Sequence, residues 1–369
     1  MRITMVIGAL GGGGAERVVT LLANEFSRRG HNVSIVTYSP GSAYSLDRSV
    51  EHHSIFDEVQ MKNRDLFSRI LRRVLFYPRF LSMLKKENPD IVISFLVSMN
   101  IKTILASKFL GFPVIVTEHI NYMKDMTLSA WLGRRWIYKI ADEVTVLTRF
   151  DHEHYYSKFL NNVEVMPNPL ACVPVKKMPP KDKVILASGS LDRWHHKGFD
   201  NLLKVFARCH AAYPGWKLQI AGGGEKGRVY LQQLASDLNI DSKVEFLGFC
   251  RDLQTYMQKA SIFVLSSRYE GFGLVLIEAM SQGCACVSFD CIAGPGEIID
   301  DGVDGVLVED QNLEAMEQAL LELMGNEDLR RTLALNAVES AKRYLPERIG
   351  EKWVGLLELL VSKKRECDV

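Results

Sequence analysis

Two basic side chains, Arg193 and Lys197, lie four positions apart in residues 189–198. This segment follows an apolar run typical of a strand and precedes a helical pattern, so both cations are expected at the ligand-binding edge of a parallel sheet. Two cations held at such an edge neutralise the charge of a departing diphosphate. For either residue alone, a solvated basic loop is the simpler interpretation. His195 and His196 are interpreted as surface histidines, because no acidic or histidine partner follows at a convincing metal-binding spacing.

A second segment, residues 270–278 with the sequence EGFGLVLIE, combines two glutamates with two glycines. Glu270 closes a loop after a predicted strand, and the glycines allow a ligand to approach the backbone closely. A helix is predicted directly afterwards, so its first N–H groups, which lack an intrahelical acceptor, favour a bound anion. Glu278 follows a little over two helical turns later and is placed to reach a ribose hydroxyl. A buried structural ion pair is the alternative for Glu278.

Two glycine-rich segments are further candidates for anion binding. Residues 11–14 are four glycines between the first predicted strand and the first helix, although a tight turn is the alternative. Residues 222–227 fit the G-x-G-x-x-G spacing of dinucleotide-binding loops, and Glu245 follows at about the right distance. Because Glu245 falls inside a predicted strand rather than at its end, a glycine-rich turn is the preferred interpretation of residues 222–227.

Residues 62–86 carry eight basic residues and one acidic residue. On a helix, the apolar residues from Leu66 to Leu75 gather on one side and the arginines on the other, which predicts a basic amphipathic helix. Its apolar side either covers a core or docks on anionic lipid, and its arginines could bind the diphosphate of a lipid-linked acceptor. The arginines assigned to this surface are Arg64, Arg69, Arg72, Arg73 and Arg79.

The elements that must position these residues follow from hydrophobic patterning. Short β-branched runs alternate with helical periodicity, which predicts an α/β chain with parallel sheets. Before a proline-rich linker at 167–180, strands are predicted at 3–7, 33–37, 91–95, 114–117, 144–147 and 163–166. After it, strands are predicted at 184–188, 217–221, 244–247, 262–265 and 285–288, and helices at 199–212, 226–238, 252–259 and 274–282. Residues 312–361 are predicted to be helical, with breaks near 325 and 346.

Composition limits the possible classes of function. A chain of 369 residues is expected to form two domains, and a net charge of +1 gives no sign of nucleic-acid binding. No apolar run is long enough to span a bilayer. Seven scattered cysteines without a C-x-x-C pair favour reduced thiols in the cytoplasm over disulfides or zinc. No Asp-x-Asp motif stands in a plausible loop, so no metal is expected.

Taken together, these segments resemble the retaining GT-B glycosyltransferases of family 4, also called glycosyl transferases group 1. The motifs that carry the resemblance are Gly13-Gly14-Ala15-Glu16-Arg17, Thr117-Glu118-His119, Arg193 with Lys197, Glu270 with Glu278, and Gly294-Pro295-x-Glu297-Ile298-Ile299. The resemblance implies two Rossmann-like doubly wound domains facing a central cleft. Residues 1–170 would bind the acceptor, residues 171–345 would bind a nucleotide sugar, and the helix in 346–369 would cross back to the first domain.

The resemblance also implies roles for individual residues. Arg193 and Lys197 would hold the donor diphosphate, and Glu278 would bind the ribose. Glu270 would face the hydroxyls of the donor sugar, and His119 would lie beside the anomeric carbon. The backbone positions that would complete the donor site are Gly13, Gly14, Phe249, Leu253, Phe272, Gly273 and Leu274. One departure from the family pattern is that Leu191 and Asp192 stand between the strand and Arg193.

The function implied is transfer of a sugar, from UDP-N-acetylgalactosamine or a related UDP-hexose, to a polyprenyl-diphosphate-linked saccharide in bacterial glycan, capsule or lipopolysaccharide assembly. The resemblance implies a metal-independent enzyme without a cofactor, attached to an anionic membrane surface at the inner face of the cytoplasmic membrane. Two alternatives remain open. One is a UDP-sugar epimerase of the same fold, and the other is a sugar-nucleotide binding protein without catalysis.

Overall fold

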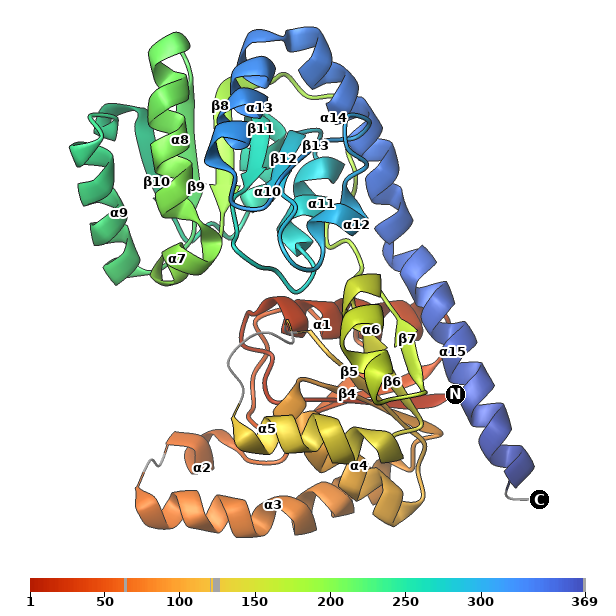
Figure 1. Cartoon of the computed structure of the whole chain (residues 1–369). Coiled ribbons are helices and arrows are strands. Elements are labelled where there is room, and N and C mark those ends of the chain that lie inside the picture. The colour runs from red at the N-terminus through yellow and green to blue at the C-terminus, as the bar shows by residue number, and fades with distance from the viewer. Residues whose placement is uncertain (63–64, 120, 122–126, 368–369) are drawn as a thin grey trace. The chain divides into compact units, whose positions relative to one another are not determined.

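A computed structural model describes residues 1–62, 65–119, 121 and 127–367 of the chain (Figure 1). Contacts divide the chain into two compact units. Unit 1 contains residues 1–171 together with 345–369, and unit 2 contains residues 172–344. Each unit is built around one parallel β-sheet, so the predicted α/β class with two doubly wound domains is confirmed.

The sheet of unit 1 has the strand order β3-β2-β1-β4-β5-β6-β7, and all its pairings are parallel. Its strands are β1 (Arg2–Ile7), β2 (Asn32–Thr37), β3 (Val50–Ser54), β4 (Ile91–Phe95), β5 (Val114–Thr117), β6 (Glu143–Val146) and β7 (Val163–Val165). The central strands β4 and β5 are buried along their whole length, as expected of a sheet covered on both faces.

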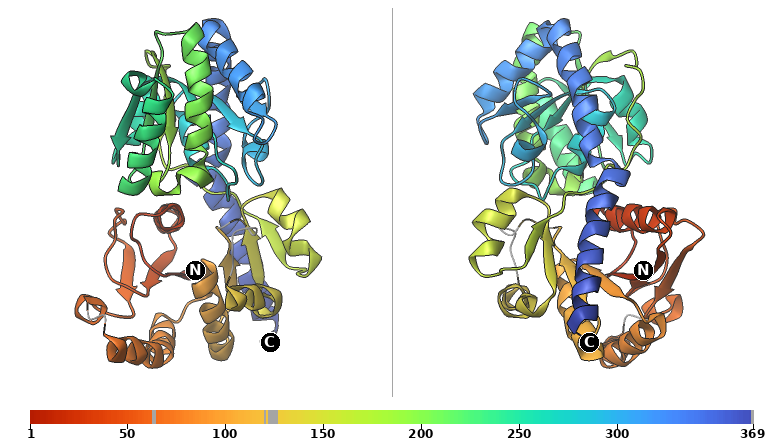
Figure 2. Two further views of the ribbon diagram at one scale, coloured as in Figure 1. Left: turned by 60° about the vertical axis from the view of Figure 1, so that its left-hand side comes forward. Right: turned by 90° about the vertical axis from the view of Figure 1, so that its right-hand side faces the viewer.

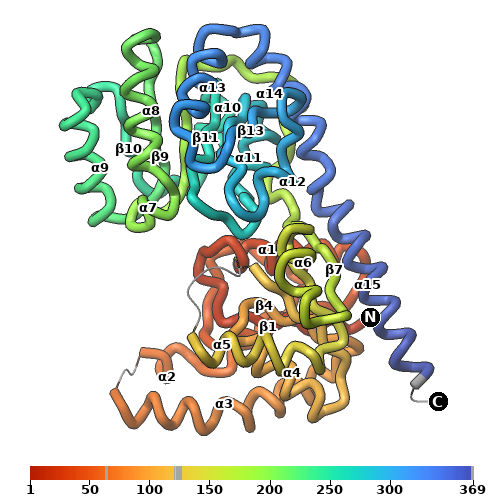
Figure 3. Tube along the Cα trace, in the orientation of Figure 1, coloured from red at the N-terminus to blue at the C-terminus, as the bar shows by residue number. Residues whose placement is uncertain are grey.

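The helices of unit 1 cover both faces of this sheet. They are α1 (Gly14–Arg28), α2 (Glu58–Lys62), α3 (Leu66–Glu87), α4 (Val97–Leu110), α5 (Leu128–Leu132), a π-helical turn (Gly133–Ile137), 3₁₀ turns (Tyr138–Ile140 and Tyr156–Lys158), α6 (Arg149–His154) and α15 (Pro346–Cys367). The connections that carry α3, α4 and α5 all advance in one direction across the sheet, whereas the connection that carries α1 runs the other way. Right-handed crossovers therefore place α3, α4 and α5 on one face and α1 on the opposite face (Figure 3).

Helix α15 belongs to unit 1 although it follows unit 2 in the sequence. Figure 2 shows it beside α1, where Trp353 packs edge-on against Phe26 with 6.4 Å between ring centroids. The contact is close, because a Cβ added to Gly350 would come within 2.5 Å of the side chain of Glu25. None of the helices in the described part of the chain combines the length and apolar character needed to cross a bilayer.

Unit 2 contains a second parallel sheet, with the strand order β10-β9-β8-β11-β12-β13. Its strands are β8 (Asp182–Ser188), β9 (Lys217–Ala221), β10 (Val244–Gly248), β11 (Ala260–Leu265), β12 (Ala285–Phe289) and β13 (Val306–Val308). Its helices are α7 (Trp194–Lys197), α8 (Phe199–Ala212), α9 (Glu225–Asp237), α10 (Leu253–Lys259), α11 (Leu274–Ser281), α12 (Pro295–Ile298), α13 (Leu313–Gly325) and α14 (Glu327–Ala341), with 3₁₀ turns at Leu191–Arg193, Asp241–Lys243 and Lys342–Tyr344.

Most predicted elements are confirmed to within two residues. The strands at 91–95, 114–117 and 217–221 and the helix at 199–212 have the predicted bounds. Strands β3 and β13 were not predicted. Both are edge strands, and β3 has the sequence VEHHS, in which only Val50 is buried. An edge strand with polar residues does not show the apolar run on which the predictions relied.

Candidate functional site

Lys197 and Glu270, predicted to share one site, are in contact in unit 2. The 3₁₀ turn and α7 that follow β8 carry Arg193 and Lys197, and Glu270 lies in the loop after β11, the strand that pairs with β8. The Lys197 Nζ atom donates to Glu270 Oε1 at 2.7 Å. Only 15% of the lysine side chain and 11% of the glutamate side chain are exposed, so this is a largely buried ion pair. Arg193 is exposed at the end of the 3₁₀ turn, directly before α7.

A glycine fixes how closely α7 approaches β11. Gly198 has a φ of +64°, and a Cβ at this position would lie 1.8 Å from the carbonyl oxygen of Ser266. The Ser266 hydroxyl donates to the carbonyl of Lys197 at 2.9 Å, and the Arg268 amide donates to that of His196 at 2.9 Å. The backbone on both sides of the ion pair is therefore held by direct hydrogen bonds.

An arginine that sequence reasoning missed supports the same loop. Arg268 makes two hydrogen bonds of 2.9 Å to the carboxylate of Asp200 and a further bond to the carbonyl of His195. Burial raises the pKa of Asp200, but the hydrogen bonds and charge of Arg268 outweigh burial and lower it. Its place in the sequence could have identified it, because Arg268 stands two residues before Glu270 in the same predicted loop.

His196 corrects the interpretation of both histidines as surface residues. Its ring is half-buried and stacks on Tyr269, with 3.9 Å between centroids and 11° between planes. Nε2 lies 2.8 Å from the Tyr269 carbonyl, and Nδ1 faces the guanidinium of Arg193. A carbonyl and a guanidinium together require the neutral tautomer with its proton on Nε2. Burial and then the charge of Arg193 lower the pKa of His196 to about 4. His195 is exposed, as predicted.

Glu270 is an ionised carboxylate held in place from several sides. Besides Lys197, its Oε1 accepts a hydrogen bond from the hydroxyl of Ser267 at 2.6 Å. Burial favours the neutral acid, but the charge of Lys197 and these hydrogen bonds lower the pKa of Glu270. The Glu270 amide donates to the carbonyl of Ile292 at 3.3 Å, which ties the loop to the segment after β12.

The glycine of the Gly-Pro-x-Glu motif supports the neighbouring backbone. Gly294 has a φ of +113°, and a Cβ there would lie 2.0 Å from the carbonyl oxygen of Phe272. Phe272 is buried and packs edge-on against Tyr344 at 5.5 Å. Gly273, with a φ of +102°, precedes Leu274, where α11 begins. The first N–H groups of α11 thus follow Glu270 within four residues, on a backbone held by Gly294.

The remaining donor-site candidates in unit 2 lie on elements that follow β10 and β11. Glu278 is buried on α11. Phe249 is 78% exposed in the loop after β10, and Leu253 is the first residue of α10. These positions lie after the carboxyl ends of parallel strands, the edge at which open α/β sheets bind ligands.

The glycines of segment 222–227 allow close backbone packing against the residues after β8. A Cβ at Gly222 would lie 1.7 Å from the carbonyl oxygen of Gly189, and a Cβ at Gly227 would lie 1.8 Å from that of Leu191. The Gly227 amide donates to Asp192 at 2.9 Å. The glycines allow α9 to pack against the loop that carries Arg193, which supports the interpretation as a turn.

In unit 1, an amide of the glycine-rich loop already donates to a carboxylate of the helix that follows it. The Gly13 amide donates to Glu16 Oε2 at 2.6 Å, and the hydroxyl of Tyr44 donates to the Gly13 carbonyl at 3.2 Å. Gly14 is the first residue of α1. An anion that bound the Gly13 amide would have to displace the carboxylate of Glu16.

His119 follows β5, next to a buried polar cluster. Its ring stacks on Phe95 with 5.5 Å between centroids, and burial lowers its pKa to about 4, so its imidazole is neutral at pH 7. The preceding residue, Glu118, is buried and accepts hydrogen bonds from Arg134 at 2.6 Å and from the hydroxyl of Tyr138. In the sequence, Glu118 stands out only as part of a motif, because its partners Arg134 and Tyr138 lie 16 and 20 residues away.

The arginines predicted on the basic helix divide into two groups. Arg69 and Arg73 are exposed on α3, whereas Arg72 donates to the Gln60 carbonyl and Arg79 donates to the Gln60 side chain at 2.8 Å. Arg64 lies outside the described residues. The apolar residues at the start of α3 are exposed rather than packed on a core. They are Leu66, Phe67, Ile70, Leu71 and Val74.

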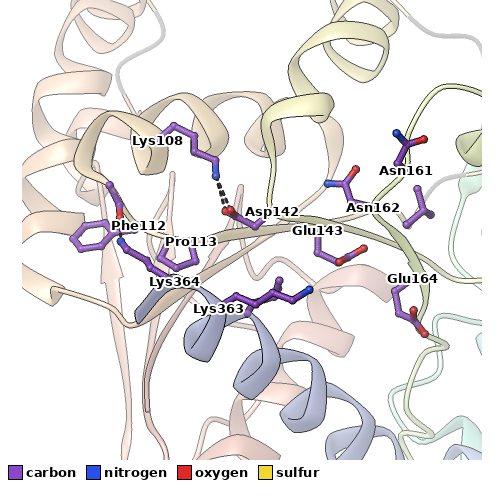
Figure 4. Close-up of a pocket in the computed structure, with 13 residues that line it drawn as sticks. Lys108, Phe112, Pro113, Asp142, Glu143, Asn161, Asn162, Glu164, Lys363 and Lys364 are labelled. Atoms are coloured by element: carbon purple, nitrogen blue, oxygen red, sulfur yellow. Dashed lines mark hydrogen bonds and ion pairs between the residues drawn. The ribbon is translucent and has the colours of Figure 1, made fainter. Parts of the chain in front are cut away.

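A pocket of about 720 Å³ lies at the edge of the unit 1 sheet where its parallel strands begin, opposite the edge that carries His119 (Figure 4). Its walls come from the starts of β5, β6 and β7 and from the end of α15, and they carry Lys108, Asp142, Glu143, Glu164 and Lys363. Burial and then the charge of Glu164 raise the pKa of Glu143 to about 7. None of the predicted site residues lines this pocket.

Comparison with known proteins gives consistent matches along the chain. Residues 12–172 match the family model described as Glycosyltransferase Family 4, and residues 173–340 match the model described as Glycosyl transferases group 1. The chain is 31% identical to a Campylobacter jejuni GalNAc-alpha-(1->4)-GalNAc-alpha-(1->3)-diNAcBac-PP-undecaprenol alpha-1,4-N-acetyl-D-galactosaminyltransferase, over 97% of this chain and 98% of that one.

Solved structures share the fold. Sucrose-phosphate synthase from Thermosynechococcus elongatus has a TM-score of 0.80 at 19% identity, over 98% of this chain and 99% of that chain. Anabaena HepE in complex with UDP and glucose has a TM-score of 0.78 at 17% identity, over 97% and 99% of the two chains. These similarities confirm the predicted GT-B fold.

Proposed function

The chain belongs to the group 1 glycosyltransferases of family 4, and on that premise we propose that it transfers a sugar from a UDP-sugar to a polyprenyl-diphosphate-linked saccharide in bacterial glycan, capsule or lipopolysaccharide synthesis. The name of the Campylobacter relative, which describes an undecaprenol-linked acceptor and transfer of N-acetylgalactosamine, supports the acceptor class and favours UDP-N-acetylgalactosamine among the donors. The complex of HepE with UDP and glucose supports a uridine nucleotide as the carrier.

The observation that carries the proposal is the buried Lys197–Glu270 pair beside Arg193 and the start of α11. In the proposed reaction, the bond between the anomeric carbon and the diphosphate oxygen breaks, and its electron pair stays on the diphosphate. Lys197, Arg193 and the first N–H groups of α11 stabilise that negative charge, which needs no metal ion. The sugar passes through an oxocarbenium-like state.

Transfer with retention follows if the acceptor hydroxyl attacks from the face that the diphosphate leaves. The departing phosphate oxygen takes the hydroxyl proton, so charge and atoms balance without a protein base. Glu270 orients the sugar hydroxyls. It is a weak candidate for a covalent nucleophile, because the adjacent ammonium of Lys197 neutralises its charge and lowers its pKa.

The other residues have proposed binding roles. Glu278 binds the ribose, and the backbone near Phe249 and Leu253 frames the base. His119 hydrogen-bonds to the sugar through a neutral imidazole, in agreement with its low pKa. Backbone N–H groups of Phe272, Gly273 and Leu274, and of Gly13 and Gly14 in unit 1, contact the diphosphate, which displaces the Glu16 carboxylate from the Gly13 amide.

On the acceptor side, the arginines of α3 are proposed to bind the acceptor diphosphate and anionic headgroups at the inner face of the cytoplasmic membrane. Arg69 and Arg73 are available for this role, because both are exposed. Arg72 and Arg79 also hold α2, so their substitution would alter local structure as well as charge.

The experiment that tests the function supplies purified protein with individual UDP- and GDP-sugars, with and without a polyprenyl-diphosphate-linked saccharide, in the presence of EDTA. We expect lipid-linked product from one donor only, with nucleotide release that depends on the acceptor. Glu270→Gln is expected to bind the donor but to suppress transfer, whereas Glu245→Gln, which alters an exposed carboxylate of β10, retains activity.

Three results would contradict the proposal. Conversion of a UDP-sugar to its epimer without acceptor would identify an epimerase. Donor binding without turnover for any donor and acceptor would identify a binding protein. Loss of transfer in EDTA, restored by a divalent cation, would overturn the metal-independent mechanism.

A further inference from the structure

A buried ion pair stands directly before His119 and has no role in the reaction derived so far. It joins Glu118, the residue after β5, to Arg134 in the π-helical turn, and only 3% of the glutamate side chain and 1% of the arginine side chain are exposed. The guanidinium donates from Nε to Glu118 Oε1 at 3.2 Å and from a terminal nitrogen to Oε2 at 2.6 Å. The hydroxyl of Tyr138 also donates to Oε1. Both carboxylate oxygens are therefore occupied, which fixes the orientation of the carboxylate.

The pair is ionised although it lies away from water. Burial lowers the pKa of Arg134, but the charge of Glu118 outweighs burial and raises it above its usual value. Burial and then the charge of Glu118 raise the pKa of Tyr138, so its hydroxyl stays a neutral donor at pH 7. A buried ion pair adds little stability compared with an apolar pair of the same size. The geometry that the pair fixes therefore explains it better than stability does.

A second set of hydrogen bonds holds the main chain at the end of β5. The Asn100 side chain on α4 donates to the carbonyl of Thr117 and to the hydroxyl of Tyr138, both at 2.9 Å. The Glu118 amide donates to the carbonyl of Thr145 on β6 at 2.9 Å. Tyr138 therefore joins the side chain of Glu118 to the residue that supports the backbone beside it.

The partners of Glu118 are placed by a contact with α4. Arg134 lies in the π-helical turn, and such turns are rare and frequent at functional sites. The turn approaches α4 so closely that a Cβ at Gly133 would lie 2.1 Å from the side chain of Ile101. Tyr138 begins the 3₁₀ turn that follows and is fully buried. The packing of these turns on α4 thus sets where both partners of Glu118 lie.

His119 is the residue whose position depends on these contacts. It follows Glu118 directly, so a fixed Glu118 restricts its backbone. The His119 ring stacks on Phe95, which is fully buried at the end of β4. The imidazole is therefore constrained by its own backbone and by the aromatic ring beside it.

We propose that Glu118 is a positioning residue for His119: Arg134 and Tyr138 hold its carboxylate, and this fixes the imidazole at the end of β5. Glu118 does not touch the substrate, because its side chain is buried and both of its oxygens accept hydrogen bonds within the fold. The inference deepens the proposed function and rests on it for the contact between His119 and the donor sugar. Loss of the network displaces the imidazole without removing any group that binds the nucleotide.

The test is a double-mutant cycle on the full chain. Tyr138→Phe removes one hydroxyl and leaves its ring and the Glu118–Arg134 pair in place. Its matched control is Tyr156→Phe, because the Arg134 guanidinium lies 5.9 Å from the Tyr156 ring centre and the buried Tyr156 hydroxyl makes no hydrogen bond to any residue that the structure describes. Each substitution is made in wild type and in His119→Ala, and transfer kinetics and UDP affinity are measured.

In the wild-type background, Tyr138→Phe is expected to lower kcat/KM for the UDP-sugar on the order of tenfold, because a small misplacement of a positioned group has effects of at least this size. UDP, which carries no sugar, is expected to bind unchanged. In the His119→Ala background, Tyr138→Phe is expected to have no further effect. Tyr156→Phe is expected to leave transfer unchanged in both backgrounds.

A second readout needs neither donor nor acceptor. In protein with isotope-labelled histidine, the ring signal that disappears in His119→Ala reports the pKa of His119, which burial lowers to about 4. We expect this pKa to rise toward 6.5 in Tyr138→Phe, because a loosened ring becomes hydrated. Glu118→Gln with Arg134→Met removes both charges together and is expected to raise it in the same way.

The proposal is overturned if Tyr138→Phe lowers transfer equally in both backgrounds, or if Tyr138→Phe and Tyr156→Phe behave alike. It is also overturned if the pKa of His119 is unchanged in Tyr138→Phe and in the double variant. If that pKa rises as expected but wild type transfers no sugar, the positioning of His119 by Glu118 stands and the proposed function fails.

Discussion

At the scale of single residues, the Lys197–Glu270 pair shows how a site is stabilised and constrained by the same contact. Both charges are largely removed from water, so each is tolerated only because the other is present. The pair adds little net stability compared with an apolar pair, but the loss of one partner leaves a buried charge. The stability of unit 2 therefore depends on the presence of both charges of the pair.

Lys197→Met is expected to destabilise unit 2 by about 3 kcal/mol, because Glu270 would remain buried without its counter-charge. The double variant Lys197→Met with Glu270→Gln is expected to recover most of that loss, yet to remain inactive. Denaturant unfolding and transfer rates measure the two effects separately. Equal stability of the single and double variants would show that the pair is not coupled.

His196 is expected to position Arg193 for the donor diphosphate. His196→Phe keeps a ring to stack on Tyr269 but loses the acceptor for the guanidinium, so KM for the donor should rise about tenfold with a smaller change in kcat. His195→Phe, which alters the exposed neighbour, should leave both constants unchanged. Equal effects of the two variants would argue against this role.

The low pKa of His119 predicts a pH dependence of stability for unit 1. The folded state keeps this imidazole neutral down to about pH 4, whereas an unfolded chain protonates it below about 6.5. Between these values the unfolded state binds more protons, so stability falls as pH falls from 6.5 toward 4. Thermal unfolding at several pH values should show a shallower decline in His119→Asn than in wild type, and an unchanged decline would contradict the low pKa.

At the scale of elements, close backbone contacts rather than side chains set the geometry of the proposed donor site. Gly198 against Ser266, Gly294 against Phe272 and Gly222 against Gly189 leave no room for a Cβ. The first contact sets the distance between the end of α7 and the residue after β11. The second sets the distance between the residues before α11 and those before α12, and the third sets the distance between the loop before α9 and the residue after β8. These contacts therefore determine where Lys197 and Glu270 lie.

Gly198→Ala is expected to lower the stability of unit 2 and to raise KM for the donor, because α7 must move away from Ser266. Gly302→Ala is the matched control, because its φ is +71° but no atom lies within 4 Å of a Cβ placed there. The control should cost only the conformational term, about 1 kcal/mol, and leave catalysis intact. Thermal unfolding and donor titration give both quantities, and an equal loss in the two variants would contradict a steric role.

The elements also show what a sequence can and cannot reveal. Buried parallel strands such as β4 and β5 are continuous apolar runs, and the glutamate–glycine loop before α11 is a recognisable pattern. Strand β3 was missed because its residues are polar, and β13 because it has three residues at a sheet edge. The roles of Arg268, Glu118 and His196 depend on partners distant in sequence or on ring stacking, which no local spacing encodes.

At the scale of the whole molecule, unit 1 consists of two stretches of chain separated by the whole of unit 2. The second stretch is mainly α15, which buries Trp353 against Phe26 of α1. The Arg29 guanidinium donates to the carbonyl of Glu347 at 2.5 Å at the start of the same helix. Helix α15 is therefore part of the core of unit 1.

Trp353→Ala is expected to destabilise unit 1 by about 3 kcal/mol, the usual cost of truncating a buried aromatic side chain. UDP affinity should change much less than the stability of unit 1, because most of the proposed diphosphate, ribose and base contacts lie in unit 2. Leu359→Ala, an exposed position on the same helix, is the control. Hydrogen exchange of the unit 1 strands and titration with UDP measure the two effects separately, and unchanged protection of those strands would contradict a core role of α15 in unit 1.

The return of α15 to α1 also imposes an order on biosynthesis. As the chain leaves the ribosome, α1 emerges among the first residues, but the surface that covers Phe26 is translated only after residue 345. Unit 2 is a continuous stretch and can complete its sheet while unit 1 still exposes an apolar stripe along α1. The earliest part of the chain to be made is thus the last to be finished, and a nascent chain stalled before residue 346 would present that stripe to chaperones.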